Sequence, residues 1–132
     1  MNEMPSYRLK VERAKRHINE LGQEIAAFFA RSPFVIHVQE DLKAGERVWW
    51  LEIREIVPRE WSAIVGDAIH NLRASLDLMM VAIVRRCDPA RQSYGHVYFV
   101  VSETKSKFEL RLAEAIKGAS PEARRLIEDL RP

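Results

Sequence analysis

The sequence predicts a mainly α-helical domain of the α+β class: a helical bundle with a small β-hairpin between the first helix and a long central helix. Apolar residues recur at steps of three and four over 6–30 and over 59–86, which is typical of amphipathic helices. Between these ranges, two short segments alternate apolar and polar residues, as strands do. Because 132 residues suit one compact core, we expect a single domain.

The first helix is predicted over about 6–30, where one face carries Val11, Ala14, Ile18, Leu21, Ile25 and Phe28. Pro33 ends it. Strands of a hairpin follow over 34–38 and 47–56, joined by a polar loop. A two-stranded hairpin is marginal alone, so we expect it to lie on the helices. Trp49 and Trp50 point to opposite faces; we expect one in the core and the other at a dimer contact or against a nucleic-acid base.

The remaining helices have recognisable ends. Pro58 suits a helix start, and the central helix is predicted from about 59 to 86. The apolar segment 97–101 fits either a strand or a packed extended segment. A capping box beginning at Ser106 predicts a third helix that Gly118 ends, and Ser120 is expected to cap a fourth.

The central helix carries an apolar stripe that we expect to face the core: Val65, Ile69, Leu72, Leu76, Met79 and Ile83. The opposite side also holds Ala74, Leu78 and Val81, so the second half of this helix is apolar nearly all round. Such a helix is covered from two sides, by its own chain or by a second copy. We therefore expect a homo-oligomer, most simply a dimer.

Polar residues interrupt this apolar run in the stretch GDAIHNLRASLD, namely Asp67, His70, Asn71, Arg73 and Asp77. Buried charges are tolerated when they are paired, and Arg73 can reach Asp77 one turn away. We interpret the set as a structural network that supports a helix contact. A solvated face is one alternative. A binding or catalytic site, with His70, Arg73 and Asp77 as candidates, is the other, because perturbed titrating groups cluster at functional sites.

The stretch GDAIHNLRASLD resembles the GDxxHNLRxxLD signature of an uncharacterised bacterial protein family, and a looser similarity runs from about Val11 to Pro132. Family members often have His after the last aspartate, where this chain has Leu78. They usually continue past the equivalent of IEDLRP, so the resemblance implies a shortened member or the N-terminal part of a longer protein.

The helical architecture is more remotely similar to HEPN-like domains, many of which are metal-independent RNases that use an arginine and a following histidine. Arg91 and His96 have the short end of that spacing, but they lie in an expected loop. From the central helix we predict a self-associating interaction or regulatory module, and the family resemblance implies a bacterial protein with a nucleic-acid-related role in defence or regulation. The alternative is a HEPN-like RNase or nucleic-acid-binding domain of a defence or toxin–antitoxin system. A small-molecule binder is a third class.

Composition limits the other classes of function. The formal net charge is only +2, so no strong field attracts nucleic acid or anionic lipid, and RNA would need a local patch. The N-terminus lacks the apolar core of a signal peptide and no apolar run reaches about 18 residues, so we expect a cytoplasmic protein without a membrane partner.

Metal and disulfide chemistry also find little support in the sequence. Cys87 is the single cysteine, which excludes an internal disulfide. Asp67 with His70, and His17 with Glu20 and Glu24, have helical spacings that could hold a metal. No Glu-x-x-His pair accompanies them, and the chain has four histidines. We expect no metal and no cofactor.

Overall fold

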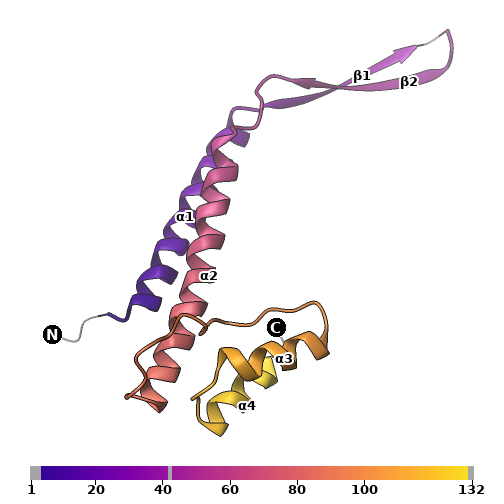
Figure 1. Cartoon of the computed structure of the whole chain (residues 1–132). Helices are drawn as coiled ribbons and strands as arrows, with labels where there is room; N and C mark the ends of the chain where they lie inside the picture. Colours follow the sequence, from indigo (N-terminus) through magenta and orange to yellow (C-terminus); the bar gives the residue numbers. More distant parts are fainter. Residues whose placement is uncertain (1–3, 42, 131–132) are drawn as a thin grey trace. The chain divides into compact units, whose positions relative to one another are not determined.

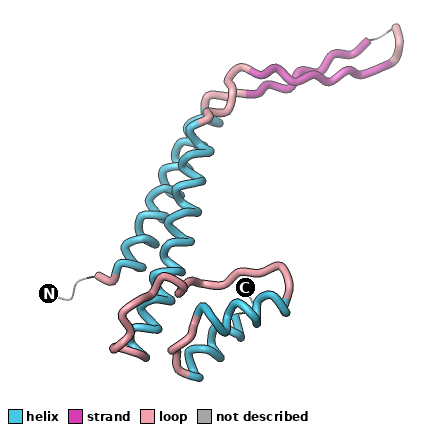
Figure 2. Tube along the Cα trace, in the orientation of Figure 1, coloured by secondary structure: helices cyan, strands magenta, loops and turns pink. Residues whose placement is uncertain are grey.

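The computed structural model describes residues 4–41 and 43–130, and it confirms the mainly α-helical class with a small antiparallel hairpin between the first two helices (Figures 1 and 2). The elements follow in the order α1 (Ser6–Ala30), β1 (Phe34–Asp41), β2 (Glu46–Ile53), α2 (Glu60–Cys87), α3 (Lys105–Ala115) and α4 (Pro121–Leu130). The predicted limits of the first and central helices agree with α1 and α2 to within one residue.

The chain divides into two compact units. The hairpin unit comprises Lys15–Ala68, and the core unit comprises Met1–Ala14 with Ile69–Pro132. Each unit contains a part of α1 and a part of α2, and each is described by itself below.

The core unit is built around one apolar cluster. Its buried members come from the second half of α2, the segment after it, α3 and α4: Met80, Val84, Val97, Phe99, Val100, Phe108, Leu112, Ala115, Ile116 and Ile127. The sequence allowed either a strand or a packed extended segment over 97–101. The structure shows the second, because this segment is extended but does not pair with a strand. Burial of these side chains supplies the main driving force for folding of this unit.

The two short helices of the core unit start at polar caps. Thr104 caps α3, and its hydroxyl oxygen accepts a hydrogen bond from the Lys107 backbone N–H at 3.4 Å. The predicted capping box at Ser106 was therefore wrong, because the helix begins one residue before that serine. Ser120 caps α4 as expected, accepting a hydrogen bond from the Ala123 N–H at 3.2 Å.

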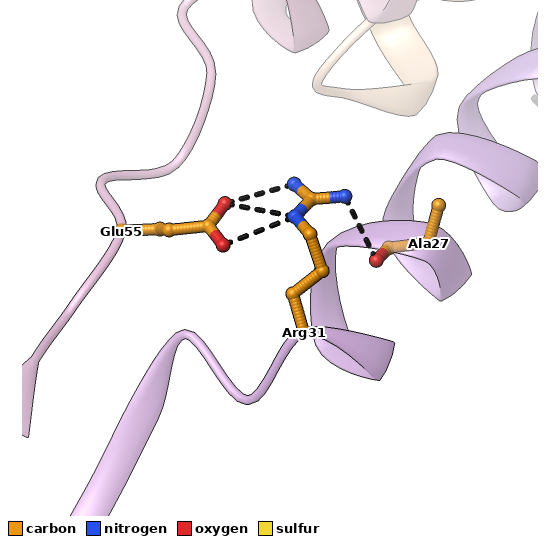
Figure 3. A network of polar contacts seen from close by, with 3 residues as sticks. All are labelled: Ala27, Arg31 and Glu55. Carbon is orange, nitrogen blue, oxygen red and sulfur yellow. Dashed lines mark hydrogen bonds and ion pairs between the residues drawn. The ribbon is translucent and has the colours of Figure 1, made fainter.

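The hairpin unit has a small aromatic core at the end of its helices. Phe28 is 1% exposed and its ring packs edge-on against Trp61 of α2, with 5.3 Å between ring centroids. Close by, the Arg31 guanidinium meets the Glu55 carboxylate at 2.8 Å, and its Nη1 donates to the Ala27 carbonyl at 3.0 Å (Figure 3). These contacts join the end of α1 to the segment between β2 and α2.

The hairpin itself has little cover within its unit. Its strands pair in register from Phe34 opposite Ile53 to Asp41 opposite Glu46. Most strand side chains are exposed, including both Trp49 and Trp50. The expectation that the hairpin lies on the helices was therefore wrong for this unit, and neither tryptophan of the pair belongs to a core.

Candidate functional site on the central helix

Arg73 and Asp77 form the best-defined polar arrangement on α2. Arg73 Nη2 lies 3.3 Å from Asp77 Oδ1, one helical turn away, as the spacing predicted. Both side chains also hold the backbone of Phe99: Arg73 donates to its carbonyl oxygen at 2.6 Å, and Asp77 accepts from its N–H at 2.9 Å.

This double hydrogen bond satisfies the donor and the acceptor of a residue whose side chain is buried. An extended segment without a strand partner needs such bonds, since unpaired backbone groups next to a core destabilise the fold. The pair fixes the segment 97–101 on α2. The arrangement therefore has a structural role, and both charged groups already have partners.

Asn71 also has a structural position. It is 8% exposed, and its Oδ1 accepts a hydrogen bond from Lys10 Nζ at 3.3 Å, which links α1 to α2 inside the core unit. Asn71 and Ser75 lie one helical turn apart on α2, and both are buried although their side chains are short and polar. Short side chains permit close approach of neighbouring helices.

His70 and Asp67 are not part of the pair at Phe99. Both residues are exposed. In the ranges that the structure describes, His70 makes no hydrogen bond or ion pair with Arg73 or Asp77. The structure thus brings together two of the three catalytic candidates and leaves the imidazole open to solvent.

The apolar stripe of α2 differs most from the sequence-based expectation. Ile69 is 62% exposed, Leu72 is 41% exposed and Val65 is 42% exposed, so this part of the stripe is not a core face of the single chain. The prediction chose the large apolar side chains as the core face of α2. In the core unit, the buried residues of α2 are instead Asn71, Ser75, Met80 and Val84. Further along, Leu76 and Ile83 are half-buried against the core cluster.

Arg91 and His96, the arginine and histidine with HEPN-like spacing, lie in different environments. Arg91 Nε donates to the Ser93 carbonyl at 2.7 Å, and its Nη1 donates to the Lys117 carbonyl. These bonds tie the loop after α2 to the end of α3. His96 is exposed. Arg91 therefore has a local structural role in addition to any role with a ligand.

A hollow of about 700 Å³ lies at the start of α3 in the core unit. Its lining includes four carboxylate side chains: Glu103, Glu109, Glu128 and Asp129. Such a lining repels phosphate groups. None of the predicted site residues lines this hollow.

One apolar surface was not predicted from the sequence. One face of the hairpin is apolar and uncovered beyond Phe34, with Ile36, Leu51 and Trp49 all more than half exposed. The alternation that predicted the strands also marked this face. Its exposure could not be foreseen, because a strand pattern does not identify what covers the strand.

Residues 4–41 and 43–130 contain neither a metal-binding cluster nor a membrane-spanning helix. No group of three or more His, Cys, Asp or Glu side chains there is arranged to hold a metal ion. His17 Nδ1 instead lies 3.6 Å from Glu20 Oε2. Within the same ranges, no helix has both the length and the apolar character that crossing a bilayer requires.

Comparisons with protein-family models, with curated proteins and with solved structures gave no match to this chain.

Proposed function

We propose that the chain is a self-associating interaction or regulatory module, in which the exposed stripe of α2 binds a second copy of the chain. The observation that carries this proposal is the exposure of two large apolar side chains one turn apart on α2, Ile69 at 62% and Leu72 at 41%. Contiguous exposed apolar residues mark interaction surfaces. In a two-fold dimer, the same stripe of each copy forms the contact.

The polar set on α2 supports this contact in the proposal. The Arg73–Asp77 pair holds the segment at Phe99, and Asn71 holds α1. The surface around Ile69 and Leu72 is then preorganised, which lowers the entropy lost on association. We further propose, from the resemblance, that the module acts in the bacterial cytoplasm.

Sedimentation velocity tests the proposal on two matched variants. Ile69→Lys places a charge on the stripe, whereas Leu110→Lys places one on an exposed leucine of α3. We expect the wild type and Leu110→Lys to dimerise alike and Ile69→Lys to dissociate about ten-fold more readily or worse, equal to at least ~1.4 kcal/mol. A wild-type chain that stays monomeric up to about 100 µM would contradict the proposal, since it excludes even weak specific association.

A metal-independent RNase is the second candidate, and the solvent exposure of His70 favours it. An accessible imidazole could act as general base on a ribose 2′-hydroxyl, and a nearby cation could stabilise the charge that develops on phosphorus. Arg73 is one turn away but is engaged with Asp77 and Phe99. Cleavage of RNA in the presence of EDTA that His70→Ala abolishes, while His96→Ala retains it, would establish this function at His70.

A further inference from the structure

The hairpin presents one face that is entirely apolar over three cross-strand pairs. The pairs are Phe34 with Ile53, Ile36 with Leu51, and Val38 with Trp49. Ile36 is 66% exposed and Trp49 is 62% exposed. The next pair, Glu40 with Arg47, is an ion pair that closes this face at the turn end. We call the six apolar residues the hairpin face.

The opposite side of the same sheet is different in chemistry. There His37 stacks on Trp50, with 3.9 Å between ring centroids, and its Nε2 lies 2.7 Å from Glu52 Oε2. These polar and aromatic side chains satisfy one another across the strands. The opposite side is therefore mixed, with Val48 and Trp50 about half exposed between polar side chains, whereas the continuous apolar surface belongs to the hairpin face.

The net charge of the hairpin limits which class of molecule can bind the hairpin face. The segment 34–53 carries four acidic and two basic residues, a net charge of −2 with His37 neutral. A surface of this sign disfavours nucleic acid and anionic lipid, both of which are attracted by clustered Lys and Arg. The hairpin face itself carries no charge between its ends, so its partner must also be apolar.

The area of the hairpin face suits a second copy of the same face. Its exposed aromatic and aliphatic side chains offer on the order of 500 Å² per chain. Two copies would bury about 1,000 Å² in total, which is the lower limit for a specific interface. Opposite charges are present at both ends of the face, Glu40 with Arg47 at the turn and Glu55 with Arg31 at the helices. Two copies can therefore meet without an excess of like charge.

We infer that the hairpin face binds the hairpin face of a second copy, so that the hairpin is a dimerisation arm. The inference rests on the proposed self-association and adds a second contact surface to it. A two-stranded hairpin is marginally stable alone, and this contact gives it the packed face that it lacks within its own unit.

A pair of substitutions on β2 tests the arm. Leu51 is 55% exposed on the hairpin face, and Val48 is 51% exposed on the opposite side of the same strand. We expect Leu51→Lys to raise the dimer dissociation constant about ten-fold or more, and Val48→Lys to change it by less than about three-fold. Sedimentation velocity measures both, beside the Ile69→Lys variant of α2.

A labelling experiment avoids introducing charge on the hairpin. In a Cys87→Ser background, Leu51→Cys and Val48→Cys are treated with a maleimide over a range of protein concentrations. We expect the cysteine at position 51 to become protected as the dimer forms, while that at position 48 reacts at an unchanged rate. Equal reactivity of both positions in an established dimer would overturn the arm.

The outcomes separate this inference from the proposed function. A dimer that Ile69→Lys breaks and Leu51→Lys does not would overturn the arm alone. A dimer that only Leu51→Lys breaks would support the arm and would exclude the α2 stripe as a dimer contact.

The labelling experiment distinguishes the other possible partners of the hairpin face. Protection of position 51 in a monomer would show that another part of the same chain covers the face, and protection only with phosphatidylcholine vesicles would show that it binds a lipid surface. Either of these results overturns a second copy as the partner. A permanently monomeric chain with both cysteines reactive overturns the arm and the proposed function together.

Discussion

The two units of this chain bury their apolar residues to very different degrees. The core unit encloses ten buried side chains from four segments in one cluster. In the hairpin unit, Phe28, Pro33 and Ala68 are the buried residues among those described, and the hairpin leaves most of one apolar face uncovered. The core unit thus has a hydrophobic core of its own, whereas the hairpin unit relies on a small aromatic cluster.

The difference suggests a division of roles. Small folding units with little buried apolar area are marginal and gain stability from a partner. The distribution of aromatic residues makes this testable, because Trp49, Trp50 and Trp61 all lie in the hairpin unit. Tryptophan fluorescence therefore follows the hairpin unit alone, while circular dichroism follows the helices of both units.

Removal of Phe28 should have the largest effect. Phe28→Ala deletes the buried ring that contacts Phe29, Phe34 and Trp61, and we expect a loss of about 3–5 kcal/mol from the hairpin unit. Urea unfolding followed by tryptophan fluorescence measures it. Phe29→Ala is the matched control, since Phe29 is 56% exposed, and it should cost less than half as much. Equal losses would mean that the aromatic cluster is not centred on Phe28.

A cavity in the core unit should cause a slightly smaller loss of stability, and circular dichroism is the probe that detects it. Leu112 is 2% exposed, and we expect Leu112→Ala to cost about 2–5 kcal/mol in urea unfolding followed by circular dichroism. Leu110→Ala, at a 77% exposed position of the same helix, should leave stability nearly unchanged. If Leu112→Ala lowers the fluorescence midpoint by the same amount, the two units unfold as one and the comparison fails.

The Arg73–Asp77 pair that holds the Phe99 backbone should contribute less to stability than either core. Asp77→Ala leaves the Phe99 N–H without its acceptor, which costs about 1–2 kcal/mol. Asp77→Asn keeps an oxygen at that position but removes the charge opposite Arg73, so we expect a smaller loss. Urea unfolding by circular dichroism compares them. If Asn destabilises as much as Ala, the ion pair at 3.3 Å matters more than the backbone hydrogen bond.

Much of the fold follows from local patterns in the sequence. The three and four spacing and Pro33 predict α1 to its last residue. The alternation at 34–38 predicts the start of β1, which continues to Asp41, whereas the strand predicted over 47–56 ends at Ile53.

The Arg73–Asp77 pair follows from helical spacing, because one turn brings those side chains together. The contact of this pair with Phe99 does not follow from helical spacing. Phe99 lies 22 positions beyond Asp77, and only tertiary packing brings the two residues together.

The face of α2 that packs within the chain was not predictable from hydrophobicity. Ile69 and Leu72 are larger and more apolar than Asn71 and Ser75, yet the second pair is buried. The buried Asn71 accepts a hydrogen bond from Lys10 of α1, a contact that hydrophobicity does not reveal. A sequence pattern shows that a side chain disfavours water, but it does not distinguish burial within the chain from burial against a second copy.

The smallest effect concerns the ion pair at the base of the hairpin. The hydrogen bond from Arg31 holds the pKa of Glu55 below its usual value, which is near 4.5. A lowered pKa in the folded state stabilises above the unfolded pKa, and the stabilisation is lost as the pH falls through the folded value. We therefore expect the difference in fluorescence-detected stability between wild type and Glu55→Gln to be present at pH 7, to shrink as the pH falls below about 4.5, and to vanish once the pH is below the lowered pKa of folded Glu55. Glu52, whose pKa Arg54 and His37 also lower, titrates in both proteins and cancels in the difference. A difference that persists well below that pH would show that the neutral acid still binds Arg31, and the base of the hairpin would then depend on hydrogen bonding and not on charge.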